Sequence, residues 1–244
     1  MFGIEVAVDA LVGPSHLLLG AGVLLILTSP LRAQHVLSDG PGDASGGWTV
    51  TAMLSLTLST TLVSFFLLYA SPFPMPASTV AFTPTPEGTP GHVEAELPVV
   101  AGLGAYLITT AVLTVALLLM VRSDRPPSFV ATLLVTPVAW LAVAVANFDG
   151  VAAAGALGAT IGAMAADLGR MRLASVGANR PYSLAVVAGG VATMVWVGQL
   201  AGLAVADALR WPVSLWFGVV VLAGLAAAAM GLLAGPADRQ SAQP

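Results

Sequence analysis

The stretch "VAAAGALGATIGAMAADLG", residues 151–169, decides the fold, because it decides how many times the chain crosses a membrane. It is the least hydrophobic of the long apolar segments. The composition around it indicates the class of protein: of 244 residues, 57% are hydrophobic and only 8% are charged. A soluble globular protein carries about 25% charged residues. The sequence therefore predicts an integral membrane protein.

Apolar windows long enough to cross a bilayer recur along the whole chain. A hydrocarbon core of about 30 Å requires about 20 apolar residues per helix. Seven windows come close to this length, so we predict an all-α, polytopic transmembrane helical bundle that forms a single domain over residues 1–244. The predicted spans are 13–31, 49–70, 98–121, 128–147, 151–168, 183–205 and 213–234.

The arginines support a crossing at 151–168. The chain contains no lysine, and its eight basic residues are all arginine. With seven spans, only Arg210 lies on one side of the membrane and the other seven arginines share the opposite side. Basic residues gather on the cytoplasmic side, so the N-terminus is predicted outside and the C-terminus inside. The inner arginines are Arg32, Arg122, Arg125, Arg170, Arg172, Arg180 and Arg239.

The longest connection, 71–97, then lies outside the membrane. It is rich in Pro, Thr and Gly, a composition that disfavours helix and favours irregular backbone. The loop could cap the outer end of the bundle or serve as a solvated connector. The lysine-free, Ala/Val/Gly-rich composition favours a prokaryotic source, which makes the plasma membrane the predicted location.

Several classes of function are excluded by residues that the chain lacks. Retinal proteins need a lysine for the Schiff base, and this chain has none. Cysteine is also absent, which excludes disulfides and thiolate metal sites. No phosphate-binding loop, dinucleotide fingerprint or hydrolase motif occurs in a usable context, and a net charge of −4 argues against nucleic acid. We therefore predict no catalytic residue, no cofactor and a lipid bilayer as the surroundings.

Hydroxyl side chains follow one face of span 49–70, and span 98–121 carries a matching set. Such groups can bond carbonyls of their own helix, so they act as polar contacts between helices or line a polar pathway. The carboxamide of Gln199 lies deep in span 183–205 and is expected to form a hydrogen bond inside the bundle. The other candidate pathway residues are Thr57, Thr60, Thr61, Ser64, Tyr106 and Thr110.

Small residues recur at helical spacing in spans 151–168 and 183–205. In lipid, such stripes let two helix backbones approach closely, so both spans are expected to pack tightly against neighbours. The alternative is a compositional bias without special contacts. The stripes consist of Ala154, Gly158, Gly162 and Ala166 in the first span, and of Gly190, Gly198 and Gly202 in the second.

A metal site is conceivable on the outer face, where histidine and carboxylate side chains occur near span ends. The spacing His-x-Glu-x-Glu can hold a divalent cation, but it is also ordinary loop composition. Asp149, in "NFDG" (147–150), reads either as a turn residue or as part of an outer site. The candidate ligands are His16, His92, Glu94, Glu96 and Asp149.

Four short motifs make the chain resemble a family of multi-pass membrane proteins from actinobacteria and related prokaryotes. They are "TLVSFFLLYASPFP" (61–74), "NFDG", "GALGATIGAMAADLGR" (155–170) and "WPVSLWFGVVVLAGL" (211–225). The resemblance implies a membrane-embedded bundle and no particular activity. It also implies histidines at the positions of Ser71 and Ser214, near the acid at Asp149. This chain has serine at both positions, which weakens a metal site there.

Three functions follow from these features. The first is a non-enzymatic subunit or scaffold that binds another membrane or exported protein. The second is a transporter or channel for a small solute, which would use the hydroxyl face. The third is an outer-face metal or redox accessory protein.

Overall fold

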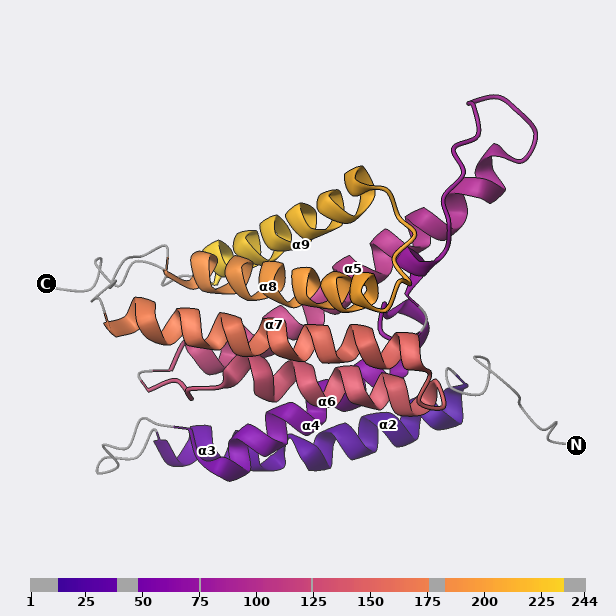
Figure 1. Cartoon of the computed structure of the whole chain (residues 1–244). Helices are drawn as coiled ribbons and strands as arrows, with labels where there is room; N and C mark the ends of the chain where they lie inside the picture. Colours follow the sequence, from indigo (N-terminus) through magenta and orange to yellow (C-terminus); the bar gives the residue numbers. More distant parts are fainter. Residues whose placement is uncertain (1–12, 39–47, 75, 124, 176–182, 235–244) are drawn as a thin grey trace, which may run out of the picture.

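The computed structural model describes residues 13–38, 48–74, 76–123, 125–175 and 183–234. Within these ranges the chain is helical and contains no strand. The long helices lie side by side, and successive ones run in alternating directions (Figure 1). The helices are α2 (Pro14–Leu27), α3 (Ser29–Ser38), α4 (Val50–Phe66), η1 (Leu68–Ala70), η2 (Ala77–Thr79), α5 (His92–Val121), α6 (Val130–Val145), α7 (Gly150–Ser175), α8 (Ser183–Val205) and α9 (Val213–Leu233).

Five helical segments are long and apolar enough to cross a membrane: Pro14–Gln34, His92–Val121, Gly150–Arg172, Leu184–Val205 and Val213–Leu233. The least hydrophobic predicted span therefore does form a helix of spanning length. The apolar helices α4 and α6 are shorter, with 17 and 16 residues. At 1.5 Å per residue they measure about 26 and about 24 Å.

Two helices extend beyond the predicted spans. The loop was expected to extend to residue 97, but α5 begins at His92, and α7 continues to Ser175, seven residues beyond the predicted span 151–168. Residues 93–97, "VEAEL", contain mostly good helix formers, and Gly91 precedes them in the left-handed conformation, with φ 86°. Pro98 lies inside α5, where it removes only one backbone donor.

The most extensive helix contact is between α7 and α8, the two helices that carry the small-residue stripes and were each expected to pack tightly against neighbours. A Cβ atom added at Gly158 would overlap the carbonyl of Gly198, and one added at Gly198 would overlap the carbonyl of Gly158. Gly162 meets the Met194 carbonyl in the same way. Glycine is therefore required for this backbone contact. Gly190 is an exception within its stripe, because nothing lies within 4 Å of the position its Cβ would take.

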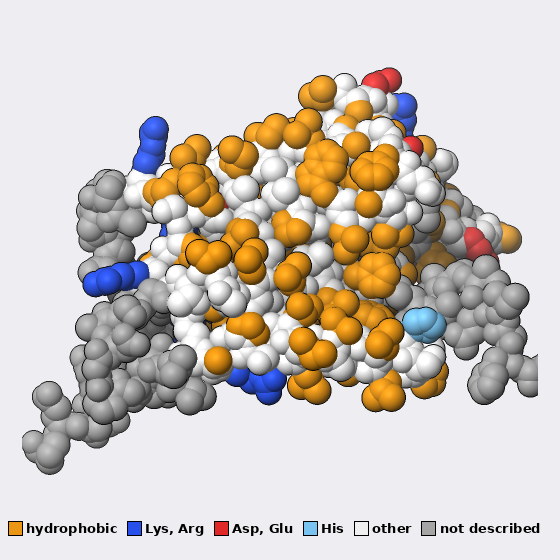
Figure 2. Space-filling model, turned by 90° about the horizontal axis from the view of Figure 1, so that it is seen from below, with side chains coloured by type: hydrophobic (Ala, Val, Ile, Leu, Met, Phe, Trp, Pro, Cys, Tyr) orange, Lys and Arg blue, Asp and Glu red, His pale blue; other side chains and the backbone are white. Residues whose placement is uncertain are grey.

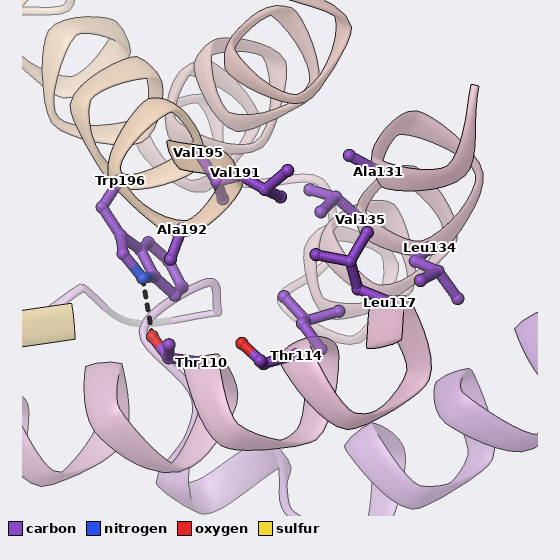
Figure 3. Close-up of a pocket in the computed structure, with 11 residues that line it drawn as sticks. Thr110, Thr114, Leu117, Ala131, Leu134, Val135, Val191, Ala192, Val195 and Trp196 are labelled. Atoms are coloured by element: carbon purple, nitrogen blue, oxygen red, sulfur yellow. Dashed lines mark hydrogen bonds between the residues drawn. The ribbon is translucent and has the colours of Figure 1, made fainter. Parts of the chain in front are cut away.

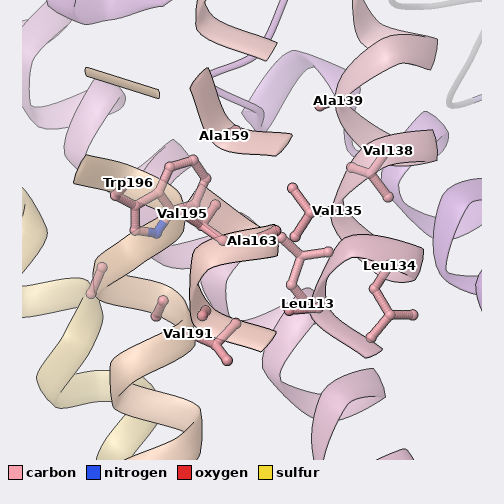
Figure 4. Close-up of a cluster of buried hydrophobic side chains, with 14 of the residues drawn as sticks. Leu113, Leu134, Val135, Val138, Ala139, Ala159, Ala163, Val191, Val195 and Trp196 are labelled. Carbon is pink, nitrogen blue, oxygen red and sulfur yellow. The ribbon is translucent and has the colours of Figure 1, made fainter. Parts of the chain in front are cut away.

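The buried core extends over α4–α9 and consists mainly of Ala, Val and Leu, and Trp196 is among its largest side chains (Figure 4). The outer surface is also apolar: large side chains of every long helix are exposed. On the face shown in Figure 2, hydrophobic side chains cover the middle, and the charged side chains lie toward the ends. This distribution suits a protein surrounded by lipid.

Helix α2 packs more loosely than the others. Gly20 is its only buried helical residue, and Phe66 of α4 lies where a Cβ at Gly20 would be. By contrast, half of the most apolar window is buried in each of α5, α7 and α8. A groove of about 270 Å³ separates α2 from α4 and is lined by apolar residues of both helices.

Candidate functional site

The loop that was predicted to lie outside the membrane enters the bundle with its first part. Phe73 and Ser78 are fully buried, although both belong to the segment between η1 and α5. The ring of Phe73 contacts Trp196 of α8 at a centroid distance of 5.6 Å, and Tyr106 of α5 meets the same indole edge-on at 4.9 Å. Three aromatic side chains from three segments thus close this end of the helix interior. Of the two alternatives for the loop, a cap over the end of the bundle and a solvated connector, these contacts fit the cap.

Hydrogen bonds hold this segment at both ends. The Gln199 Nε2 group donates to the carbonyl of Pro72 at 2.9 Å, which confirms the expectation that this buried carboxamide bonds inside the bundle. The Ser78 carbonyl accepts the backbone N–H groups of Arg210 and Trp211, at 2.8 and 3.2 Å. The connection between α8 and α9 is therefore joined to residues 71–79, which we call the outer segment after its predicted side of the membrane.

Tyr106 and Thr110 belong to the same cluster. The hydroxyls of Tyr106 and Ser78 lie 3.3 Å apart, and Thr110 donates to the Tyr106 carbonyl at 2.7 Å. The Trp196 indole N–H donates to the Thr110 hydroxyl at 2.7 Å. Two predicted pathway residues therefore form polar contacts between helices.

A cavity of about 20 Å³ lies below Trp196, between α5, α6 and α8. Figure 3 shows Trp196 bonded to Thr110 at one side and the Thr114 hydroxyl pointing toward the space between the helices. The rest of the lining is aliphatic, and a volume of this size holds about one water molecule.

The hydroxyl face of α4 divides into two groups. Thr60 and Thr61 donate to the carbonyls of Leu56 and Thr57, both at 2.8 Å, so their own helix satisfies them. Thr57 and Ser64 are buried, and neither hydroxyl has a hydrogen-bond partner within the described residues. The face is thus partly structural and partly unsatisfied.

Asp149 is a helix cap. Its side chain is exposed, and Oδ2 accepts the backbone N–H groups of Val151 and Ala152, both at 3.0 Å. The two residues before it, Asn147 and Phe148, turn the chain with φ of 53° and 56°. The turn interpretation of this motif therefore accounts for every contact of its carboxylate. Of the two serines that the family resemblance linked to it, Ser71 lines a cavity beside α5 and Ser214 is exposed on α9.

The other candidate metal ligands form one pair. His92 Nε2 lies 3.6 Å from Glu96, and its Nδ1 atom contacts the Thr85 carbonyl at 2.7 Å, which folds the tip of the loop against α5. Glu94 and His16 are exposed. Across the described ranges, no group of three or more His, Asp or Glu side chains is placed to hold a metal ion.

At the opposite end of the bundle, a buried carboxylate was missed by sequence reasoning. Asp167 of α7 is fully buried and accepts the backbone N–H groups of Ala131 and Thr132, at 3.1 and 2.9 Å, and the Thr132 hydroxyl at 2.9 Å. It thereby caps the first turn of α6. Arg170 lies 3.8 Å from the carboxylate and donates to the carbonyls of Pro127 and Ser128.

The sequence does contain a local signal for the pairing of Asp167 with Arg170. Asp167 and Arg170 are spaced i, i+3, so they share a helix face, and the acid falls at the end of an apolar span. No comparable signal marks Phe73 or Ser78. Nor does any local signal mark Trp211, which is buried against Gly102 and lies with its ring centroid 6.1 Å from that of Tyr106.

Comparison with protein-family models, curated proteins and solved structures found no match to this chain. The resemblance to an actinobacterial membrane family therefore stays a prediction.

Proposed function

We propose that the chain crosses the plasma membrane of a prokaryote seven times, with its N-terminus outside and its C-terminus inside. The alternating direction of α2 and α4–α9 supports this topology (Figure 1). Five arginines of the described residues lie in or just after the last turns of segments that finish at one end of the bundle, whereas Arg210 lies at the other: Arg32, Arg122, Arg125, Arg170 and Arg172. Arg180 and Arg239 lie outside the described ranges. For α4 and α6, local thinning of the bilayer would accommodate the shorter length.

Single cysteines test this topology without interference, because the chain has no cysteine of its own. Thr83→Cys and Ser128→Cys change exposed residues at the two ends. We expect a membrane-impermeant maleimide to label Thr83→Cys in intact cells and Ser128→Cys only after permeabilisation. Labelling of Ser128→Cys in intact cells, with Thr83→Cys protected, would reverse the orientation.

We further propose that the protein is a non-enzymatic subunit of a membrane assembly and that α2 contacts its partner. The observation that carries this proposal is the loose attachment of α2. It buries one helical residue, and Leu18 and Ile26 are 76% and 73% exposed. Helices in membranes associate through close packing rather than hydrophobicity, so a helix that packs little within its own chain remains free to pack against another.

Photo-crosslinking tests this role of α2. A photoreactive residue at Leu18 is compared with one at Leu225 of α9, which is also apolar and 63% exposed. We expect Leu18 to yield a stoichiometric adduct with one membrane or exported protein that also co-purifies with the unmodified chain, and Leu225 to yield lipid adducts only. Lipid adducts at both positions, together with a monomer in mild detergent, would refute the proposal.

A further inference from the structure

A second small cavity lies at the outer end of the seam between α4 and α5. Its volume is about 10 Å³. Three hydroxyl-bearing residues line it from three segments: Ser64 of α4, Thr109 of α5, and Ser71, which begins the outer segment. The remaining lining is aliphatic and consists of Leu67, Ile108 and Val112.

The Ser64 hydroxyl distinguishes this cavity from an ordinary packing gap. Ser64 is 8% exposed, and its Oγ atom is buried without a partner in the described structure. One turn earlier, Thr60 and Thr61 bond their own helix. Ser64 departs from this pattern at the point where the cavity begins. A buried hydroxyl without a hydrogen bond is unfavourable, so a partner in the cavity would stabilise it.

We propose that this cavity binds one water molecule, which bridges Ser64, Thr109 and Ser71. A buried water needs about 10–15 Å³ and two to four polar partners. The cavity meets the first requirement at its lower limit and the second with three hydroxyls. It is too small for an organic solute. The site is independent of the proposed contact between α2 and a partner.

The cavity below Trp196 provides a contrast. It is larger, at about 20 Å³, but its polar lining is limited to Thr110 and Thr114. Thr110 already donates one hydrogen bond and accepts another. One free hydroxyl is too few to hold a water, and apolar cavities stay dry. The number of polar partners, and not the volume, therefore determines which of the two cavities holds a water molecule.

The water would join α4 to the outer segment. Ser71 Oγ accepts a hydrogen bond from the backbone N–H of Phe73 at 3.4 Å. The ring of Phe73 in turn packs against Trp196. A bridging water between Ser64 and Ser71 would thus help to hold the segment that closes the outer end.

Thermal unfolding in detergent micelles tests the site. Ser64→Ala and Thr109→Val each remove one hydrogen bond to the water, and we expect each to lower Tm by about 2–4 °C. The double variant should lower Tm little more than either change alone, because both residues act through the same molecule. The control is Thr114→Val in the dry cavity, which should leave Tm unchanged or raise it.

Two results would overturn the proposal. The first is a rise in Tm on Ser64→Ala, or full additivity with Thr109→Val. The second is an experimental density map of the unmodified protein in nanodiscs that resolves ordered water elsewhere but none within hydrogen-bond distance of Ser64 Oγ. If a variant does not fold, this map alone decides.

Discussion

Replacing Gly198 by alanine is expected to lower the free energy of unfolding by about 3 kcal/mol, at the upper end of the usual cost of overpacking. The added methyl group would overlap the Gly158 carbonyl, which belongs to the α7 backbone. A side chain could rotate away, but a helix backbone cannot. The two helices would have to separate along the most extensive helix contact in the described structure. Chemical unfolding in mixed micelles measures this change.

Gly190→Ala on the same helix is the matched control. Gly190 is exposed, and nothing lies near the position its Cβ would take. Alanine is the better helix former by about 1 kcal/mol, so this variant should be unchanged or slightly more stable. Two identical substitutions eight residues apart are thus expected to have opposite signs. Equal effects at both positions would show that helix propensity, and not the contact with α7, determines the result.

The second large effect is expected for Asp167→Ala, which should destabilise the protein by about 3–5 kcal/mol. The substitution would leave the N–H groups of Ala131 and Thr132 without an acceptor at the start of α6, and the Arg170 guanidinium without its ion pair. These groups are buried or partly buried, so water cannot replace the carboxylate fully. Asp167→Asn keeps one acceptor oxygen and should give an intermediate loss.

Asp149→Ala is the control for this experiment, because Asp149 also caps a helix but is exposed to solvent. Loss of an exposed N-cap costs about 1 kcal/mol. The same unfolding measurement should therefore separate the two aspartates clearly. If Asp167→Ala lowers the free energy of unfolding no more than Asp149→Ala does, the bonds of Asp167 to the start of α6 do not stabilise the α6–α7 contact.

Local sequence patterns were sufficient for the helices themselves. The predicted span 183–205 coincides with α8, and 213–234 differs from α9 by one residue. Burial of Gln199 followed from its position as a carboxamide within an apolar span. The close approach of α7 and α8 followed from the spacing of Gly158, Gly162 and Gly198. Each of these features depends on residues within a few helical turns.

Patterns of the same kind left other residues ambiguous. Asp149 suited both a turn and an outer site, and its bonds to Val151 and Ala152 select the turn. The hydroxyls of α4 suited both structural contacts and a pathway, and the structure divides them between Thr60, which bonds its own helix, and Ser64, which does not. Only the surroundings of each side chain could separate these alternatives.

By itself, the sequence determined that this is an all-helical, lipid-compatible protein, where most of its helices lie, and that glycines such as Gly158 and Gly198 permit close contact. These properties arise from composition and helical periodicity, which act locally. Tertiary structure alone decided that Asp167 caps a helix 36 residues away and that Gln199 holds a loop 127 residues away. Such bonds depend on how helices are arranged around one another. That arrangement is set by the summed packing of all of them and leaves no pattern in any single segment.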